Sequence, residues 1–246
     1  MTNFYRKTLI ISPHSDDEIF TFPFIFSPDN SFGKIDLLLL ETDDKRLQES
    51  RSSCERNGFN LLTLPTHFKL KGLHFFENID HLTENLLTIY GQYDLILAPM
   101  IEGGHQDHDS VCLAILHCKD NCFSETKLIL YSTYRSQNLM PLLYTCGISK
   151  KVPSELVFSV SMPPDWLSIY ALTIIKSYRS QYLTWFMLTP LIMISLLRGN
   201  LNKFIFGNKL NCKDAIALIP NKPLYQTYRK CSRKKWLDAH KFIIKS

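Results

Sequence analysis

The stretch KTLIISPHSDDE, residues 7–18, joins a compact apolar run directly to a charged loop. The run from Lys7 to Ser12 predicts a short buried strand, because it is almost entirely apolar and ends in polar residues. A second run, from Lys34 to Leu40, has the same character. Continuous apolar runs of this length are typical of the central strands of parallel sheets, which are buried on both faces.

Strands and helices alternate after these two runs. The helix predicted over residues 44–57 pairs Lys45 with Glu49 at helical spacing, and Gly58 follows as its C-terminal stop. Further helices are predicted over 81–90, 107–118 and 163–178, and further strands over 94–98, 127–131 and 155–160. The alternation predicts an α/β fold: a Rossmann-like, mostly parallel sheet with helices on both faces and a metal site at the carboxyl ends of the strands.

The composition excludes several classes of protein. Of the 246 residues, 45% are hydrophobic and 21% are charged, which argues against a disordered chain and against a polytopic membrane protein. The nine glycines form neither a dinucleotide-binding string nor a P-loop. The N-terminus lacks the apolar region of a signal peptide, so we expect a cytoplasmic protein whose seven cysteines are free thiols.

The loop after the first strand carries one histidine and three consecutive carboxylates. Adjacent carboxylates repel one another, and a nearby cation would offset this repulsion. His14 and Asp17 flank the turn so that an imidazole nitrogen and a carboxylate oxygen could reach one point, which leaves Asp16 or Glu18 unliganded. Taken alone, the triplet is equally compatible with a solvated turn at the start of a helix.

A second polar cluster, GGHQDHD at residues 103–109, follows the strand predicted at 94–98. His105 and His108 are three residues apart and would lie on one side of a starting helical turn, with Asp107 placed to orient one of them. Both clusters follow strands of a parallel sheet, so they belong at the same edge of that sheet. We therefore predict one metal site built from two loops that are distant in the sequence.

Two imidazoles and one carboxylate suit two metals: zinc with an open position for water, or the iron of a non-haem oxygenase. Such oxygenases are usually built on double β-sheets, whereas this chain alternates strand and helix. Zinc is therefore favoured, with Fe²⁺ as the alternative ion. A free carboxylate beside the ion could take a proton from bound water and pass it to a leaving amine, so the cluster predicts a hydrolase.

The stretches PHSDDE (residues 13–18) and HQDH (residues 105–108) resemble the two motifs of the LmbE/PIG-L zinc-dependent N-deacetylases. Those enzymes remove acetyl groups from N-acetylated amino sugars. Ser15 and Gln106 each stand where the family pattern has a proline. Fainter similarities cover residues 7 to 181 and include Thr42-Asp43, Arg46, Glu49, Gly58, Lys176 and Ser180-Gln181.

The resemblance implies a metal-dependent N-deacetylase, a hydrolase of linear amide C–N bonds. It implies that His14, Asp17 and His108 are the zinc ligands. Asp16 would be the general base that acts on the metal-bound water.

Further roles follow from the same resemblance. His105 would stabilise the tetrahedral oxyanion, and Asp107 would hold His105 in place. Arg46, Lys176 and Gln181 would contact the substrate, an N-acetylhexosamine within a larger molecule such as N-acetylglucosamine on a carrier.

The C-terminal part of the chain differs from the rest in apolar content and charge. Residues 182–197 contain no charged side chain, and residues 198–246 hold 12 basic and 2 acidic residues. The apolar stretch is shorter than a bilayer span and contains Pro190, so it predicts a buried helix or lid, or a helix in the membrane interface. We therefore divide the chain into a deacetylase-like domain, 1–181, and an extension, 182–246, packed on that domain or facing the membrane.

This extension indicates that the sugar is attached to a lipid or diphosphate, as in cell-surface polysaccharide or glycolipid assembly, with the protein at the inner face of the membrane. An alternative is a nucleic-acid- or sugar-binding protein with a non-catalytic metal site. The basic residues near the C-terminus interleave with aromatic ones, as nucleic-acid contacts do, although a solvated basic helix gives the same pattern, so nucleic acid is the less favoured partner. The interleaved residues are Lys222, Tyr225, Tyr228, Arg229, Lys230, Arg233, Lys234, Lys235 and Trp236. The sequence does not determine the oligomeric state.

Overall fold

The computed structural model describes most of the chain. The described residues are 3–41, 43–64, 75–122, 124–133, 135–136, 144–145, 147–221, 223, 231–241 and 243. Some residues of the sequence analysis lie outside these ranges, namely Thr42, Lys222, Tyr225, Tyr228, Arg229 and Lys230.

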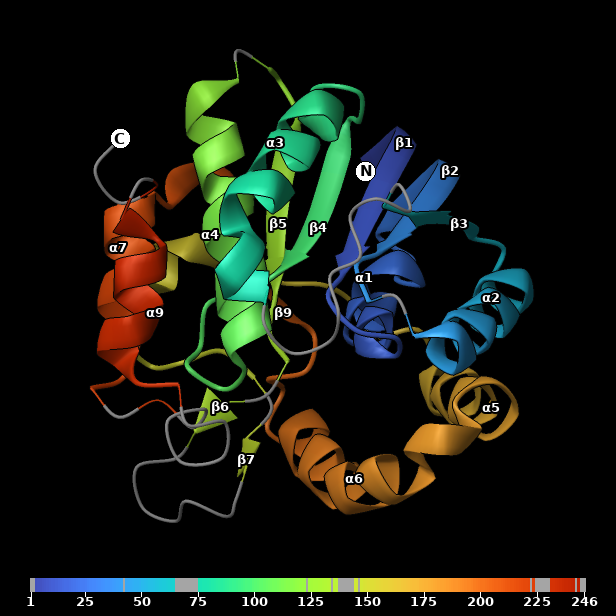
Figure 1. The fold of residues 1–246 in the computed structure, drawn as a ribbon. Coiled ribbons are helices and arrows are strands. Elements are labelled where there is room, and N and C mark those ends of the chain that lie inside the picture. Colours follow the sequence, from blue (N-terminus) through green and yellow to red (C-terminus); the bar gives the residue numbers. More distant parts are fainter. Residues whose placement is uncertain are drawn as a thin grey trace.

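A seven-stranded sheet with the order β3-β2-β1-β4-β5-β9-β8 forms the centre of the molecule (Figure 1). Its strands are β1 (Asn3–Ser12), β2 (Asn30–Leu39), β3 (Asn60–Thr63), β4 (Leu95–Pro99), β5 (Lys127–Tyr131), β8 (Val157–Ser159) and β9 (Lys203–Phe206). The strands from β3 to β5 pair in parallel, and β9 pairs antiparallel with both β5 and β8. A separate antiparallel pair joins β6 (Arg135–Ser136) to β7 (Tyr144–Thr145). The sheet is therefore mostly parallel, as predicted.

Helices cover both faces of this sheet (Figure 1). The α-helices are α1 (Phe22–Ile25), α2 (Asp44–Asn57), α3 (Ile79–Tyr90), α4 (Gln106–Asn121), α5 (Trp166–Ser177), α6 (Tyr182–Leu197), α7 (Cys212–Leu218) and α9 (Arg233–Ala239). The 3-10 helices are η1 (Asp17–Thr21), η2 (Phe75–Asn78), η3 (Ser154–Leu156), η4 (Arg179–Gln181) and η5 (Gly207–Lys209). Helices α3, α4, α7 and α9 pack on one face, and α1, α2, α5 and α6 pack on the other.

Alternate side chains of each central strand enter two separate hydrophobic cores. In β1, Leu9 and Ile11 belong to the core under α3 and α4, whereas Ile10 belongs to the core under α1 and α5. Strand β4 divides in the same way, with Ile96 on the first face and Leu97 on the second. Because both faces of the sheet are covered, the central parts of its strands are apolar, which is the pattern that made them visible in the sequence.

Local capping explains why several predicted boundaries agree with the structure. Helix α2 begins after Asp43, whose side chain accepts a hydrogen bond from the backbone N–H of Arg46 at 3.1 Å. It ends at Gly58, which has a φ of 74° that glycine adopts without steric cost. The predicted ranges of β5 and of the apolar stretch, α6, also agree with the structure.

Several strands differ from the prediction. Strands β1 and β2 begin four residues before the runs predicted at 7–12 and 34–40, and β3 was not predicted. Strand β9 was not predicted, because its four residues lie in a basic segment without a longer apolar run. Residues 155–159 form the end of η3 and the short β8, and Val160 follows β8, so the strand predicted over 155–160 is shorter than expected. Strand β9 belongs to the extension 182–246, so this part of the extension completes the sheet that the first 181 residues begin. The division at residue 181 stays a prediction.

The basic C-terminal helix α9 is anchored by an aromatic side chain. Trp236 is fully buried, and its indole N–H donates to Ser110 Oγ on α4 at 3.0 Å. A buried ring cannot stack on a nucleobase, which removes one contact from the nucleic-acid alternative.

Strand order places the two polar loops together. From β1 the chain proceeds to β2 and β3 on one side of the sheet, then returns to β4 and β5 on the other side of β1. The carboxyl ends of β1 and β4 therefore flank a topological switch point, where ligand sites of open α/β sheets occur. His14 follows β1 at this point, and His105 and His108 follow β4.

Candidate metal centre

The loop after β1 sends its three carboxylates in different directions. Asp17 turns back to His14, whose backbone N–H donates to Asp17 Oδ2 at 2.9 Å. Glu18 points into the core, where its Oε1 accepts hydrogen bonds from Ser53 Oγ at 2.7 Å and from the hydroxyl of Tyr178. Asp16 lies between them with a φ of 92°, a conformation that side chains other than glycine seldom adopt and that is common at functional sites.

The loop after β4 is fixed by backbone contacts to one carboxylate. Asp109 Oδ1 accepts from the backbone N–H of Glu102 at 2.8 Å and from that of Gly103 at 3.1 Å. Gly103 has a φ of 71°, and a Cβ there would lie 2.5 Å from Pro220 Cδ, so glycine is required. His105 caps α4, because its Nδ1 accepts from the backbone N–H of Asp107 at 3.2 Å.

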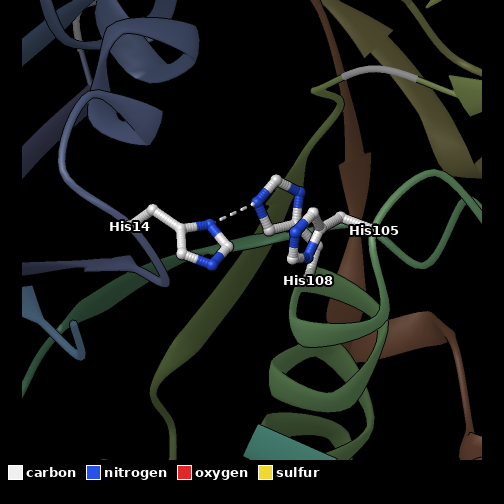
Figure 2. A group of neighbouring side chains, drawn as sticks. All are labelled: His14, His105 and His108. Carbon is white, nitrogen blue, oxygen red and sulfur yellow. Dashed lines mark hydrogen bonds between the residues drawn. The ribbon is translucent and has the colours of Figure 1, made fainter. Parts of the chain in front are cut away.

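Three donor atoms from the two loops meet at one point. The Nδ1 of His14 lies 3.3 Å from the Nε2 of His108, and Asp17 Oδ2 lies 3.3 Å from the former and 3.0 Å from the latter. Two ligands bound at about 2.1 Å to one tetrahedral ion lie about 3.4 Å apart. The spacing and chemistry of these atoms fit a zinc ion, and Figure 2 shows His14 facing His105 and His108 at the start of α4.

A third imidazole lies beside this trio. His14, His105 and His108 each offer a nitrogen, and the three nitrogens lie within 4.8 Å of one another. The rings of His14 and His105 meet edge to face, with centroids 4.6 Å apart. His105 is therefore near enough to contact a molecule bound at the trio, or to replace Asp17 as the third ligand.

In His14 and His108, the ring nitrogen that faces away from the candidate metal position contacts a second residue. Asp107 Oδ2 lies 3.2 Å from the Nε2 of His14, and Thr133 Oγ1 lies 3.0 Å from the Nδ1 of His108. Contacts of this kind fix the ring orientation of metal-binding histidines. The resemblance implied that Asp107 holds His105, but its carboxylate is nearer to His14, since it lies 3.8 Å from the Nδ1 of His105.

Carboxylates and burial together determine the charge of this pocket. Burial alone lowers the pKa of His14, yet Asp107 and Asp17 outweigh it and raise the pKa to about 10 in the metal-free protein. Burial by itself raises the pKa of Asp17, but His108 and His14 hold it well below its usual range. The carboxylates of Asp17 and Asp107 therefore favour a positive charge in this pocket.

Asp16 and Glu18 have raised pKa values for a common reason. Burial is the largest cause for both, and Asp17 adds repulsion in each case. They differ in accessibility, because Glu18 is enclosed by the core, whereas Asp16 remains partly exposed. The indole N–H of Trp185 on α6 donates to Asp16 Oδ2 at 3.0 Å. Of the two carboxylates that the sequence left open, Asp16 is the one available for chemistry.

Two of the three predicted substrate contacts lie together. With its side-chain oxygen turned toward Arg46, Gln181 accepts from Nη2 at 2.6 Å and from Nε at 3.3 Å. Arg46 Nη1 donates to Glu41 Oε2 at 3.0 Å, and Glu41 also accepts from the backbone N–H of Ser15 at 3.2 Å. A chain of contacts thus connects Gln181 to the loop that carries His14.

The third predicted contact, Lys176, lies at the end of α5, just before the segment η4 that carries Gln181. Glu49 accepts from the backbone N–H of Ser180 at 2.7 Å and from its hydroxyl at 2.6 Å, which fastens η4 to α2. Lys176, in the last turn of α5, is exposed, while Ser177 next to it is buried and lies 3.3 Å from Ser52, Oγ to Oγ. The structure does not bring Lys176 to the metal centre.

Sequence reasoning missed three residues of the site. Glu102 accepts from Ser132 Oγ at 2.6 Å and from the backbone N–H of Thr133 at 3.0 Å, which supports the threonine beneath His108. Thr133 follows a predicted strand by two residues, so its position at the carboxyl edge is a signal the sequence does contain. Trp185 lies 169 residues from Asp16 along the chain, and no local pattern indicates that contact.

Comparisons with known proteins agree with the fold. The sequence matches no protein-family model and no curated protein, whereas several solved structures match. The N,N'-diacetylchitobiose deacetylase from Pyrococcus horikoshii, complexed with its inhibitor MPG, covers 82% of this chain and 85% of its own, at a TM-score of 0.50 and 14% identity.

A glycopeptide-antibiotic enzyme gives a second match. The zinc-inhibited form of teicoplanin deacetylase Orf2 covers 80% of this chain and 96% of its own, at a TM-score of 0.55 and 11% identity. At these identities the likeness concerns the fold. The chain therefore has the α/β fold of these deacetylases, and the fold expected from the LmbE/PIG-L-like motifs is confirmed.

Proposed function

We propose that this protein is a metal-dependent N-deacetylase that hydrolyses the acetamide of an N-acetylated amino sugar. One observation carries the proposal: His14 Nδ1, Asp17 Oδ2 and His108 Nε2 lie 3.0–3.3 Å from one another at the switch point of the sheet, with Asp16 beside them. A non-catalytic metal site would have no need of a partly exposed carboxylate at that position. The fold shared with two deacetylases supports the same reaction class.

The donor set favours zinc, with Fe²⁺ as the alternative. When bound, zinc would polarise the acetyl carbonyl and lower the pKa of a coordinated water to about 7. His14, Asp17 and His108 would hold the ion, and Asp107 and Thr133 would orient the two rings. A set that uses His105 in place of Asp17 is the second candidate arrangement.

Asp16 takes the proton of the attacking water and delivers it to the departing amine. Burial and the neighbouring Asp17 raise the pKa of Asp16, which makes it a stronger base than an exposed carboxylate. His105 donates a hydrogen bond to the oxygen of the tetrahedral intermediate. Arg46 and Gln181 bind polar or phosphate groups of the substrate, whereas Lys176 is exposed on α5 and is given no role at the metal centre.

The finer proposal concerns what carries the sugar. The two solved relatives are named for diacetylchitobiose and for teicoplanin, so related folds accept sugars in different molecules. The apolar stretch 182–197 and the basic residues after it favour a sugar attached to a lipid or a diphosphate. We place the enzyme in the cytoplasm, at the inner face of the membrane.

Acetate release tests the reaction. Purified protein is incubated with N-acetylated sugars, sugar nucleotides, glycolipids and thiol glycosides, with and without a chelator, and acetate is quantified. We expect release from one class of compound, loss of that release with chelator, and recovery on adding zinc. Release that persists unchanged in a protein shown to be metal-free would overturn the metal-dependent mechanism, and no release from any compound with zinc loaded would overturn the deacetylase.

A further inference from the structure

Exposed apolar side chains gather on two neighbouring helices. Ten large hydrophobic side chains are exposed among the described residues, and nine of them lie on α5 and α6. They include Leu172 and Ile175 on α5, and Leu183 and Phe186 on α6, the last two each 76% exposed. Figure 1 shows α5 and α6 together at the lower edge of the molecule, away from α7 and α9. Soluble proteins seldom leave so much apolar surface in one place without a function.

Helix α6 is anchored to the protein along one side. Trp185, Leu188, Ile192 and Ser195 recur at three- and four-residue spacing and are buried. Only 22% of the most apolar window within residues 179–197 is buried, although this helical stretch is long and apolar enough to cross a membrane. Spanning a bilayer would require the anchored side to leave the core and break the contact of Trp185 with Asp16. The helix is instead placed to lie flat, with its apolar side outward.

The charged residues within α5, α6 and the segments that connect and follow them have one sign. Between Asp165 and Asp214 the sequence contains six lysines and arginines and no acidic residue. Lys176, Arg179 and Arg198 are exposed at the ends of the two helices. Basic side chains beside an apolar face complement a bilayer that contains anionic lipids, because headgroup attraction and acyl-chain burial then act together. Two copies of this face would place like charges opposite each other, so a lipid surface is favoured over a second copy.

We propose that the α5–α6 face docks on the surface of an anionic bilayer, with α6 in the headgroup region. The same helix contacts Asp16 through Trp185, so docking brings the helix that borders the metal centre to the lipid surface. If the proposed deacetylase reaction holds, the substrate class is an N-acetylated sugar carried by a membrane lipid.

Vesicle flotation with the full chain tests the docking. The probes are phosphatidylcholine vesicles with and without phosphatidylglycerol. The variant L183S/F186S/L197S removes three outward side chains, and F4S is the matched control, because Phe4 is 64% exposed on β1, outside this face. We expect wild type and F4S to float with the anionic vesicles, and the triple variant to bind at least about tenfold more weakly. High salt should weaken wild-type binding, because it screens the basic residues.

Several outcomes would overturn the docking proposal. These are wild-type flotation no greater than that of the triple variant, equal binding to neutral and anionic vesicles, or a dimer in light scattering that the triple variant converts to monomer. Protein stripped of metal should float like wild type, so the docking result does not depend on catalysis. Acetate release by the triple variant connects this face to the substrate. We expect the triple variant to lose release from a vesicle-embedded glycolipid and to retain release from a soluble sugar.

Discussion

Two buried imidazoles in this molecule have pKa values that are shifted in opposite directions. His14 and His240 are both enclosed by protein, and burial alone lowers the pKa of each. His240 stacks on Trp236, and its Nδ1 lies 2.7 Å from that residue's carbonyl oxygen. This hydrogen bond raises the pKa of His240, but burial outweighs it and lowers the pKa to about 4. Beside His14, the carboxylates of Asp107 and Asp17 reverse the shift and raise the pKa to about 10.

The difference separates a structural histidine from a candidate ligand. The pocket of His240 offers one backbone acceptor and favours a neutral ring, which suits packing. The pocket of His14 contains two carboxylates and a second imidazole, and it favours positive charge. Both rings are buried, so the neighbouring charges distinguish the metal centre from the rest of the interior.

Removing each ring tests this distinction most strongly. His14→Ala should abolish zinc binding and acetate release, because two ligands cannot retain the ion at the affinity of three. His240→Phe should retain one zinc per chain, since its ring only packs against Trp236. Metal content of the purified variants, measured by mass spectrometry, checks both. Full zinc content in His14→Ala would place the ion elsewhere.

Asp16→Asn separates metal binding from proton transfer. The substitution preserves the shape of the side chain and removes its basicity, so turnover should fall by about 10²–10⁴-fold with zinc retained. Asparagine also tolerates the positive φ observed at this position. Acetate release and metal content are measured on the same sample. Wild-type turnover in this variant would assign the proton transfer to another group.

Asp107→Asn tests the carboxylate that supports His14. Zinc affinity should weaken by about 10–100-fold, as is usual when the residue behind a metal-bound histidine is changed. Thr133→Val, behind His108, should act in the same direction. Competition with a zinc chelator gives the affinities. An effect on turnover alone, with unchanged zinc affinity, would show that Asp107 acts through His105, as the family resemblance first implied.

The smallest expected effect is the contribution of His240 to the pH dependence of the free energy of unfolding. His240 has a folded-state pKa of about 4, below its ordinary 6.5, so the unfolded chain binds more protons between these values and the free energy of unfolding falls as the pH is lowered. At pH 5.5 the loss is about 1.4 kcal/mol. Chemical denaturation from pH 7.5 to pH 5 measures it, and His240→Phe should reduce the slope. An equal slope in both proteins would assign it to other groups.

His14, in the metal centre, changes the free energy of unfolding with pH in the opposite direction. In metal-free protein, His14 contributes stability that is fully present below pH 6.5 and is lost as the pH rises toward its folded-state pKa of about 10. Denaturation in the presence of a chelator, repeated on the alkaline side with His14→Ala, measures this contribution. A free energy of unfolding that stays constant there would contradict the pairing with Asp17 and Asp107.

Much of the fold was predictable because its signals are local. The strand at 127–131 is a single apolar run, and the helix 44–57 has a capping aspartate and a terminal glycine, so both boundaries agree with the structure. Strand β9 had no such signal, since KFIF at 203–206 is short and its pairing with β5 depends on residues more than 70 positions away. Tertiary context determined that strand.

The site was predictable to the extent that strand ends are predictable. Both motifs follow strands, and parallel pairing places His14 and His108 together, although 94 residues separate them. The partner of Asp107 was not predictable in the same way: sequence proximity suggested His105, whereas the fold brings His14 nearer. Trp185 could not be inferred at all, because it reaches Asp16 from a helix with no motif.

The antiparallel strand inserted between β5 and β8 restricts how the C-terminal third can be studied. A chain shortened to stop at residue 181 would leave without a partner those N–H and C=O groups of β5 that face β9, and would separate β8 from the sheet. Exposed backbone of this kind recruits other chains and promotes aggregation. Such a protein would fail to bind vesicles simply because it had precipitated, so the lipid question calls for point substitutions in an intact chain.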